Sequence, residues 1–134
     1  MKIVFLNHQD WGIEPKAFKP LMARLKKAVD VHQGALNVVF VNDAYIRALN
    51  KQYRGQDEPT DVLSFTYGEG DLLGEIYISV PMAKRQAEQF KHSLADELSK
   101  LFVHGFLHIH GHDHESDEDY ERMKTIEDEV LNKR

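Results

Sequence analysis

The 134-residue sequence contains no cysteine. It can therefore form neither a disulfide bond nor a catalytic thiol, and any bound metal must be held by nitrogen and oxygen ligands. It has no apolar run approaching the roughly 18 residues of a membrane-spanning helix. The apolar stretch and small-residue cleavage site of a signal peptide are missing from the start of the chain, MKIVFLNHQDW. We therefore expect a cytoplasmic protein that has no membrane partner.

Length and charge limit the organisation of the chain. It is long enough for a hydrophobic core, and no repeat or linker divides it, so we expect one domain over residues 1–134. The net charge is −5, yet residues 1–112 carry 13 basic and 13 acidic side chains, whereas residues 113–134 carry 4 and 9. The overall acidic charge of the chain argues against a general nucleic-acid coat protein. The basic residues of the neutral part could form a patch or simply solvated helix faces.

Histidine is concentrated in one short segment. Five of the eight histidines lie between positions 104 and 114, and three of them, His104, His108 and His114, are spaced i, i+4 and i+10. On a helix the first two lie on one side, about 5.4 Å apart along the axis. Gly111 permits a left-handed turn that brings His114 back toward them. Three imidazoles with a fourth position open are typical of catalytic zinc, so the spacing predicts one Zn²⁺ per chain.

Other interpretations of these histidines exist. Two histidines four apart can be a half-buried pair, and a histidine-rich stretch can bind metals adventitiously. The third histidine, with glycine where the backbone must turn, favours the zinc site over both. We expect His110 and His112 to face solvent or to support the ligands from outside. A structural zinc would instead need a fourth protein ligand, from His110, His112 or an acidic residue.

Hydrophobic periodicity and turn residues predict a mixed α/β fold, with helices packed on a four-stranded sheet and the metal site at the end of a central helix. Ser93 caps this central helix, whose apolar stripe includes Leu101 and Phe102. Asn42 or Asp43 and Ser116 begin two other helices. We expect strands over residues 2–7, 36–41, 61–67 and 72–80, and helices over residues 15–31, 43–52, 81–91, 94 to about 110, and 116–131.

The histidine spacing also matches the zinc signature of the metzincin peptidases, H-E-x-x-H-x-x-G-x-x-H. This match suggests an α+β, zincin-like fold. In those peptidases the glutamate after the first histidine is the general base. Here that position is Gly105, which argues against a peptidase of this mechanism. Another group, or the metal alone, must then activate the water.

With glycine at that position, the string H-G-x-L-H-x-x-G-x-D-H closely resembles the YbeY family of zinc-dependent endoribonucleases, which are implicated in the maturation of bacterial ribosomal RNA. The resemblance covers most of the chain. Thr66 stands where the family usually has proline, and Glu75 where aspartate is common. Four further segments resemble the family in the same order: Leu49-Asn50 with Tyr53-Arg54-Gly55, Thr60–Phe65, Leu73–Ile76 and Ile78–Pro81.

The resemblance implies roles for particular residues. His104, His108 and His114 match the zinc ligands of the family, and Arg54 matches an arginine needed for activity. The residues alone leave Arg54 open, because its guanidinium could hold a phosphate or bond the carbonyls at a helix end. Asp113 could orient a ligand histidine or simply form a turn.

The resemblance also implies a substrate and partners. We expect a single-strand-specific endoribonuclease acting in ribosomal RNA processing, including late maturation of the 3′ end of 16S rRNA and ribosome quality control. Its partners would be precursor RNA and the ribosome or its small subunit. Ser64 is a possible polar wall of the cleft, and the general base stays open among Glu75, Asp113 and the metal hydroxide.

Two alternatives remain open beside the nuclease. One is a zinc hydrolase that acts on a peptide or a small ester. The other is a ribosome-associated binding protein whose zinc is structural.

Overall fold

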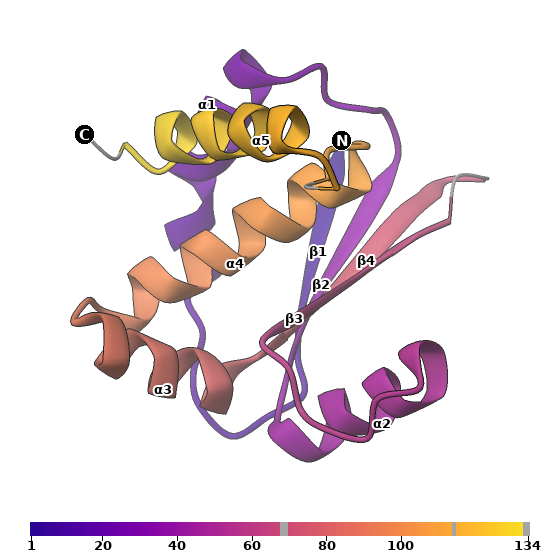
Figure 1. The fold of residues 1–134 in the computed structure, drawn as a ribbon, viewed down its shortest axis with the longest axis vertical. Coiled ribbons are helices and arrows are strands. Elements are labelled where there is room, and N and C mark those ends of the chain that lie inside the picture. The colour runs from indigo at the N-terminus through magenta and orange to yellow at the C-terminus, as the bar shows by residue number, and fades with distance from the viewer. Residues whose placement is uncertain (68–69, 114, 133–134) are drawn as a thin grey trace.

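The computed structural model describes residues 1–67, 70–113 and 115–132. At its centre lies a four-stranded sheet with the order β1-β2-β4-β3 (Figure 1). The strands β1 (Lys2–Asn7), β2 (Ala35–Val41) and β4 (Leu72–Ser79) are parallel, whereas β3 (Val62–Thr66) pairs antiparallel with β4 at the edge of the sheet. The expected mixed sheet of four strands is therefore confirmed.

Helices cover both faces of this sheet unequally. Figure 1 shows α1, α3, α4 and α5 on one side and α2 alone on the other, near one end of the strands. Within the described residues, no helix is long and apolar enough to span a bilayer. The helices of the described chain are α1 (Lys19–Ala28), α2 (Asp43–Arg54), α3 (Val80–Phe90), α4 (Leu94–Ile109) and α5 (Asp117–Val130), with a short 3₁₀ turn, η1, at Pro15–Phe18.

The helix starts follow from their capping residues. At α2, α3, α4 and α5 the side chain of the residue before the helix accepts a hydrogen bond from the backbone N–H three residues on. These capping residues are Asn42, Ser79, Ser93 and Ser116. Three of the four helix starts were expected from the sequence, whereas α3 begins at Val80, one residue earlier than expected.

The prediction of one continuous helix over residues 15–31 is wrong, because the segment is divided in two and its helix ends earlier. Pro20 has no N–H and its ring clashes with the carbonyl four residues back, so the chain forms η1 before α1 rather than one helix. The helix α1 then ends at Ala28, since Val29 is extended. Val29 and Val31 instead pack against the main core.

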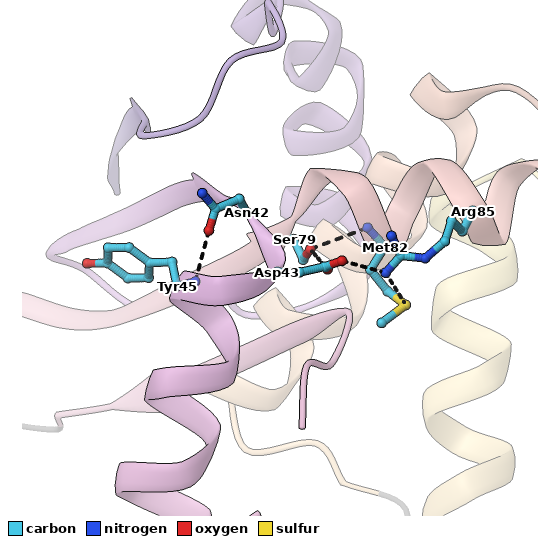
Figure 2. Close-up of polar contacts among 6 residues, drawn as sticks. All are labelled: Asn42, Asp43, Tyr45, Ser79, Met82 and Arg85. Atoms are coloured by element: carbon cyan, nitrogen blue, oxygen red, sulfur yellow. Dashed lines mark hydrogen bonds and ion pairs between the residues drawn. The ribbon is translucent and has the colours of Figure 1, made fainter. Parts of the chain in front are cut away.

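Polar contacts join α2 and α3 at the carboxyl ends of two parallel strands (Figure 2). Asp43, the first residue of α2, accepts hydrogen bonds from Ser79 Oγ at 2.8 Å and from Arg85 of α3 at 2.7 Å. The same Ser79 Oγ accepts the Met82 N–H that begins α3. These bonds fix the start of α2 on the sheet, and thereby the direction in which its last residue, Arg54, is presented.

The central helix α4 lies directly on strands β3 and β4. The predicted apolar stripe is confirmed, with Leu98, Leu101 and Phe102 buried in the main core. At Gly105 a Cβ atom would lie 2.9 Å from Ile76 Cγ2 and 3.0 Å from Ser64 Oγ. Only glycine allows this approach, so the helix that carries the histidines is held close to the sheet.

Candidate active site

A pocket of about 450 Å³ lies between the C-terminal half of α4, the edge strand β3 and the end of α2. It brings together Arg54, Ser64, His104 and His108, which come from three separate elements. A larger pocket of about 650 Å³ lies between β1 and α1, but its lining is mainly apolar and holds none of the predicted site residues. The smaller pocket is therefore the candidate active site. Its remaining lining residues are Thr60, Asp61, Val62, Leu63 and Thr66.

His104 and His108 project into this pocket from successive turns of α4. Their Nε2 atoms lie 3.1 Å apart, and the ring planes meet at 73°. Two nitrogens that bind one tetrahedral zinc at about 2.0–2.1 Å are separated by about 3.3 Å. The side chains present thus fit a shared metal ion, and the predicted convergence of these two histidines is confirmed.

The third predicted ligand, His114, lies outside the described residues. Among the residues that the structure does describe, no group of three ligating side chains occurs. The turn that should bring His114 back is nevertheless present, because Gly111 has φ +90° directly after the end of α4. A Cβ atom there would touch nothing within 4 Å, so glycine is required for its backbone conformation alone. The assignment of His114 stays a prediction.

Glu127 of α5, which sequence reasoning did not single out, contacts one of these histidines. Its Oε1 lies 3.0 Å from His104 Nδ1. Glu127 shares a helix face with Met123 and Val130, which are both buried. An acidic residue at a core-facing position of an amphipathic helix is the sequence signal that could have revealed it.

Arg54, which matches an arginine of the family that is needed for activity, lines the pocket of His104 and His108. It is the last residue of α2, which ends because Gly55 adopts a left-handed conformation. The carbonyls of Asn50 and Lys51 accept the Gly55 N–H, and within the described chain the Arg54 guanidinium makes no hydrogen bond or ion pair. The structure therefore does not support a helix-end role for this side chain, and its catalytic role remains a prediction.

Ser64 and Asp61 form part of the polar wall on the β3 side. Ser64 Oγ lies 3.5 Å from the carbonyl oxygen of Gly105 on α4. Asp61, which the sequence analysis did not select, accepts the Val62 N–H at 2.7 Å and lies 3.4 Å from Gln86 Nε2. It is the one carboxylate among the described residues that line the pocket.

Glu75 was a candidate general base, and the structure contradicts that role. Side chains alternate along β4, so Gly74 and Ile76 face α4 while Glu75 faces the opposite side of the sheet. There Glu75 accepts hydrogen bonds from Tyr67 Oη at 2.5 Å and Asn37 Nδ2 at 3.2 Å. The bond to Glu75 raises the pKa of the Tyr67 phenol well above its ordinary value. Glu75 is therefore separated from His104 by the sheet itself.

Asp113 has the geometry of a turn residue. Its Oδ1 accepts the backbone N–H of Glu115 at 3.3 Å, as in an Asx turn. Together with His112 it lines a small separate pocket beside Asp119 and Arg122. The described contacts thus favour the turn interpretation of Asp113 over support of a ligand histidine.

His110 is half-buried, and its described contacts include neither His104 nor His108. Its ring stacks on Phe106 with centroids 4.2 Å apart, and its Nδ1 lies 2.9 Å from the Phe106 carbonyl oxygen. Its Nε2 accepts the His32 N–H at 3.1 Å. Burial lowers the pKa of His110 below its ordinary value. This ring therefore joins the end of α4 to the segment before β2 rather than facing open solvent, and a role of His110 in supporting the ligand histidines stays a prediction.

The family model of the endoribonuclease YbeY matches residues 8–134. The chain belongs to the YbeY family. A YbeY endoribonuclease from Pelotomaculum thermopropionicum is 46% identical over 145 residues, which cover 98% of this chain and 95% of that protein. One from Acholeplasma laidlawii is 44% identical over 135 residues, covering 99% and 96%.

A solved structure extends the YbeY comparison to the fold. The solution structure of TM1509 from Thermotoga maritima is 35% identical and superimposes with a TM-score of 0.66, covering 97% of this chain and 89% of that one. The family match confirms the resemblance drawn from the histidine motif and the expectation of a hydrolytic enzyme. The structural match confirms the expected fold class.

Proposed function

We propose that this protein is a zinc-dependent endoribonuclease that cuts single-stranded RNA. The observation that carries the proposal is the convergence of His104 and His108 with Arg54 around one polar pocket. In this proposal His104, His108 and His114 hold one Zn²⁺. Bound zinc would polarise a phosphate and lower the pKa of water in its open position.

Arg54 supplies the phosphate-binding part of the mechanism. Cleavage of a phosphodiester places growing negative charge on the non-bridging oxygens. A guanidinium can donate two parallel hydrogen bonds to such oxygens, and such a charge-assisted contact is stronger than a neutral one. Because the Arg54 guanidinium forms no hydrogen bond or ion pair with other described residues, its N–H groups are available to a substrate in the pocket.

Exposed aromatic rings beside the pocket support a single-stranded substrate. Tyr53 precedes Arg54, is 59% exposed and packs edge-on against Phe65 with centroids 5.1 Å apart. Phe65 lies on the edge strand β3 between the pocket residues Ser64 and Thr66, with its side chain on the other face of that strand. Unpaired bases stack on exposed aromatic rings, whereas paired bases are already stacked within a duplex. An RNA strand that leaves the pocket around the edge strand β3 would therefore meet the exposed ring of Tyr53.

The biological substrate follows from the family rather than from the pocket. The relatives from P. thermopropionicum and A. laidlawii both carry the name endoribonuclease. We propose that this chain cuts ribosomal RNA precursors in the cytoplasm, at the 3′ end of 16S rRNA, in association with the ribosome or its small subunit.

His104→Ala tests the proposal. We expect this variant to lose bound zinc and RNA cleavage while keeping its fold, because the apolar core of α4 does not depend on a metal. Zinc content by elemental analysis, thermal unfolding, and cleavage of matched single-stranded and duplex RNA with and without chelator give the measurements.

His112→Ala is the matched control, since it removes a histidine of the same segment that the proposal leaves out. It should keep both zinc and cleavage. Loss of zinc in both variants together with unfolding would support a structural zinc with four protein ligands. Cleavage that survives in His104→Ala or in the presence of chelator would contradict a metal-dependent nuclease.

A further inference from the structure

We infer that Glu127 is a positioning residue of the metal site, which fixes the tautomer of His104 so that its Nε2 lone pair faces the metal. The inference rests on the proposed zinc site, whereas the contact between Glu127 and His104 is formed by the two side chains alone. Glu127 Oε1 lies 3.0 Å from His104 Nδ1, and the two side chains are 22% and 33% exposed. This contact joins α5 to the active-site helix α4.

The position of Glu127 is set by the core. Met123, four residues earlier on α5, and Val130, three residues later, are both buried in the main core. Arg24 of α1 in addition donates a hydrogen bond to the carbonyl oxygen of Val130. Glu127 is thus held on the inner face of a helix that packs against both α1 and α4 (Figure 1).

The chemical consequence concerns the single proton of a neutral imidazole. A neutral histidine carries its proton on either Nδ1 or Nε2, and the partner of one nitrogen decides which. A carboxylate can only accept, so Glu127 keeps the proton of His104 on Nδ1. The Nε2 atom of His104 then carries the lone pair of the ring, on the side where Nε2 of His108 lies 3.1 Å away.

A simple ion pair between two helices is the competing explanation. Ion pairs that are partly exposed to solvent contribute little to stability. An ion pair of that kind would affect the melting temperature slightly and leave zinc affinity and the tautomer unchanged. Positioning of the ligand predicts the reverse pattern, in which zinc affinity falls and folding is nearly untouched.

The first test measures zinc affinity by competition with a chromophoric chelator for Glu127→Ala and Glu127→Gln. Loss of such a partner weakens metal binding by about 10–100-fold, which is the result expected for Glu127→Ala. Glu127→Gln should lose less, because its amide oxygen still accepts a hydrogen bond from Nδ1. The control is Glu129→Ala, an exposed residue of the same helix about 200° away around its axis, which should leave zinc affinity unchanged.

The second test needs no metal. Long-range ¹H–¹⁵N spectra of the zinc-free protein should show His104 protonated on Nδ1 in the parent, and a shift toward the Nε2-protonated form in Glu127→Ala. A parent that binds no zinc would overturn the proposed function, while the spectra would still decide the role of Glu127. An unchanged tautomer, or an unchanged zinc affinity in Glu127→Ala, would overturn the inference.

Discussion

Removing His92 should destabilise the protein far more than its surface position suggests. Glu97 of α4 is 0% exposed, and its Oε1 lies 2.6 Å from His92 Nε2. Lys100 Nζ is 3.9 Å from the same oxygen, and Oε2 of Glu97 has no hydrogen-bond partner among the described residues. The substitution His92→Ala would leave this buried carboxylate without its short hydrogen bond.

The magnitude follows from the cost of an uncompensated buried charge. Removing one partner of a buried pair costs about 3–5 kcal/mol. His92 is 24% exposed, so water can reach part of the site after the substitution, and the lower end of about 3 kcal/mol applies. Replacing the charge itself is a different perturbation, since an apolar side chain of similar volume is often neutral or stabilising. Glu97→Met should therefore cost little.

A double-mutant cycle separates the two effects. Urea unfolding of the parent, His92→Ala, Glu97→Met and the double variant gives four free energies, all measured with chelator so that metal binding contributes equally. We expect His92→Ala to cost about 3 kcal/mol in the parent and less than about 1 kcal/mol when position 97 is methionine. An equal cost in both backgrounds would refute the reasoning, because the histidine would then act through packing alone.

Two further predictions concern the pocket and the opposite face of the sheet. Arg54→Lys should be nearly as damaging as Arg54→Ala, with turnover lower by on the order of a hundredfold, about 3 kcal/mol, and zinc content unchanged. Single-turnover cleavage measures this loss, with Arg47→Ala on the same helix as control, since Arg47 is exposed and paired with Asp57. Burial together with Glu75 raises the pKa of Tyr77 to about 12, so its contribution to stability is complete below pH about 10 and is lost as the pH rises through about 12. The pH of alkaline unfolding should therefore rise in Tyr77→Phe. Ultraviolet titration of the parent should show a phenol that ionises near pH 12 and that this variant lacks.

Local sequence features predicted the parts of the site that lie on one element. Ser93 and Gly111 mark the two ends of α4, and the spacing of His104 and His108 places both rings on one side of it. Gly55 likewise ends α2 and makes Arg54 its last residue. In each case the physical determinant lies within a few residues of the feature that it controls, as in capping, positive φ and helical periodicity.

Features that depend on long-range packing were not predictable in the same way. The contact between Glu127 and His104 spans 23 positions and requires that α5 pack on α4. The position of Glu75 required the register of β4, because a shift of one residue moves a side chain to the other face of the sheet. Periodicity alone suggested neither the break at Pro20 nor the burial of Glu97.

Gly105 connects the packing of the fold to the chemistry of the pocket. In the metzincin signature a glutamate follows the first histidine and serves as the general base. Here a Cβ atom at that position would lie 2.9 Å from Ile76 Cγ2 and 3.0 Å from Ser64 Oγ, so a glutamate would be forced into the contact between α4 and the sheet. Asp61 is the one carboxylate among the described lining residues, and it already accepts the Val62 N–H. The close packing that fixes the two histidines thus excludes the peptidase arrangement of the base, and among the described lining residues it leaves Arg54 as the one arginine or lysine in their pocket.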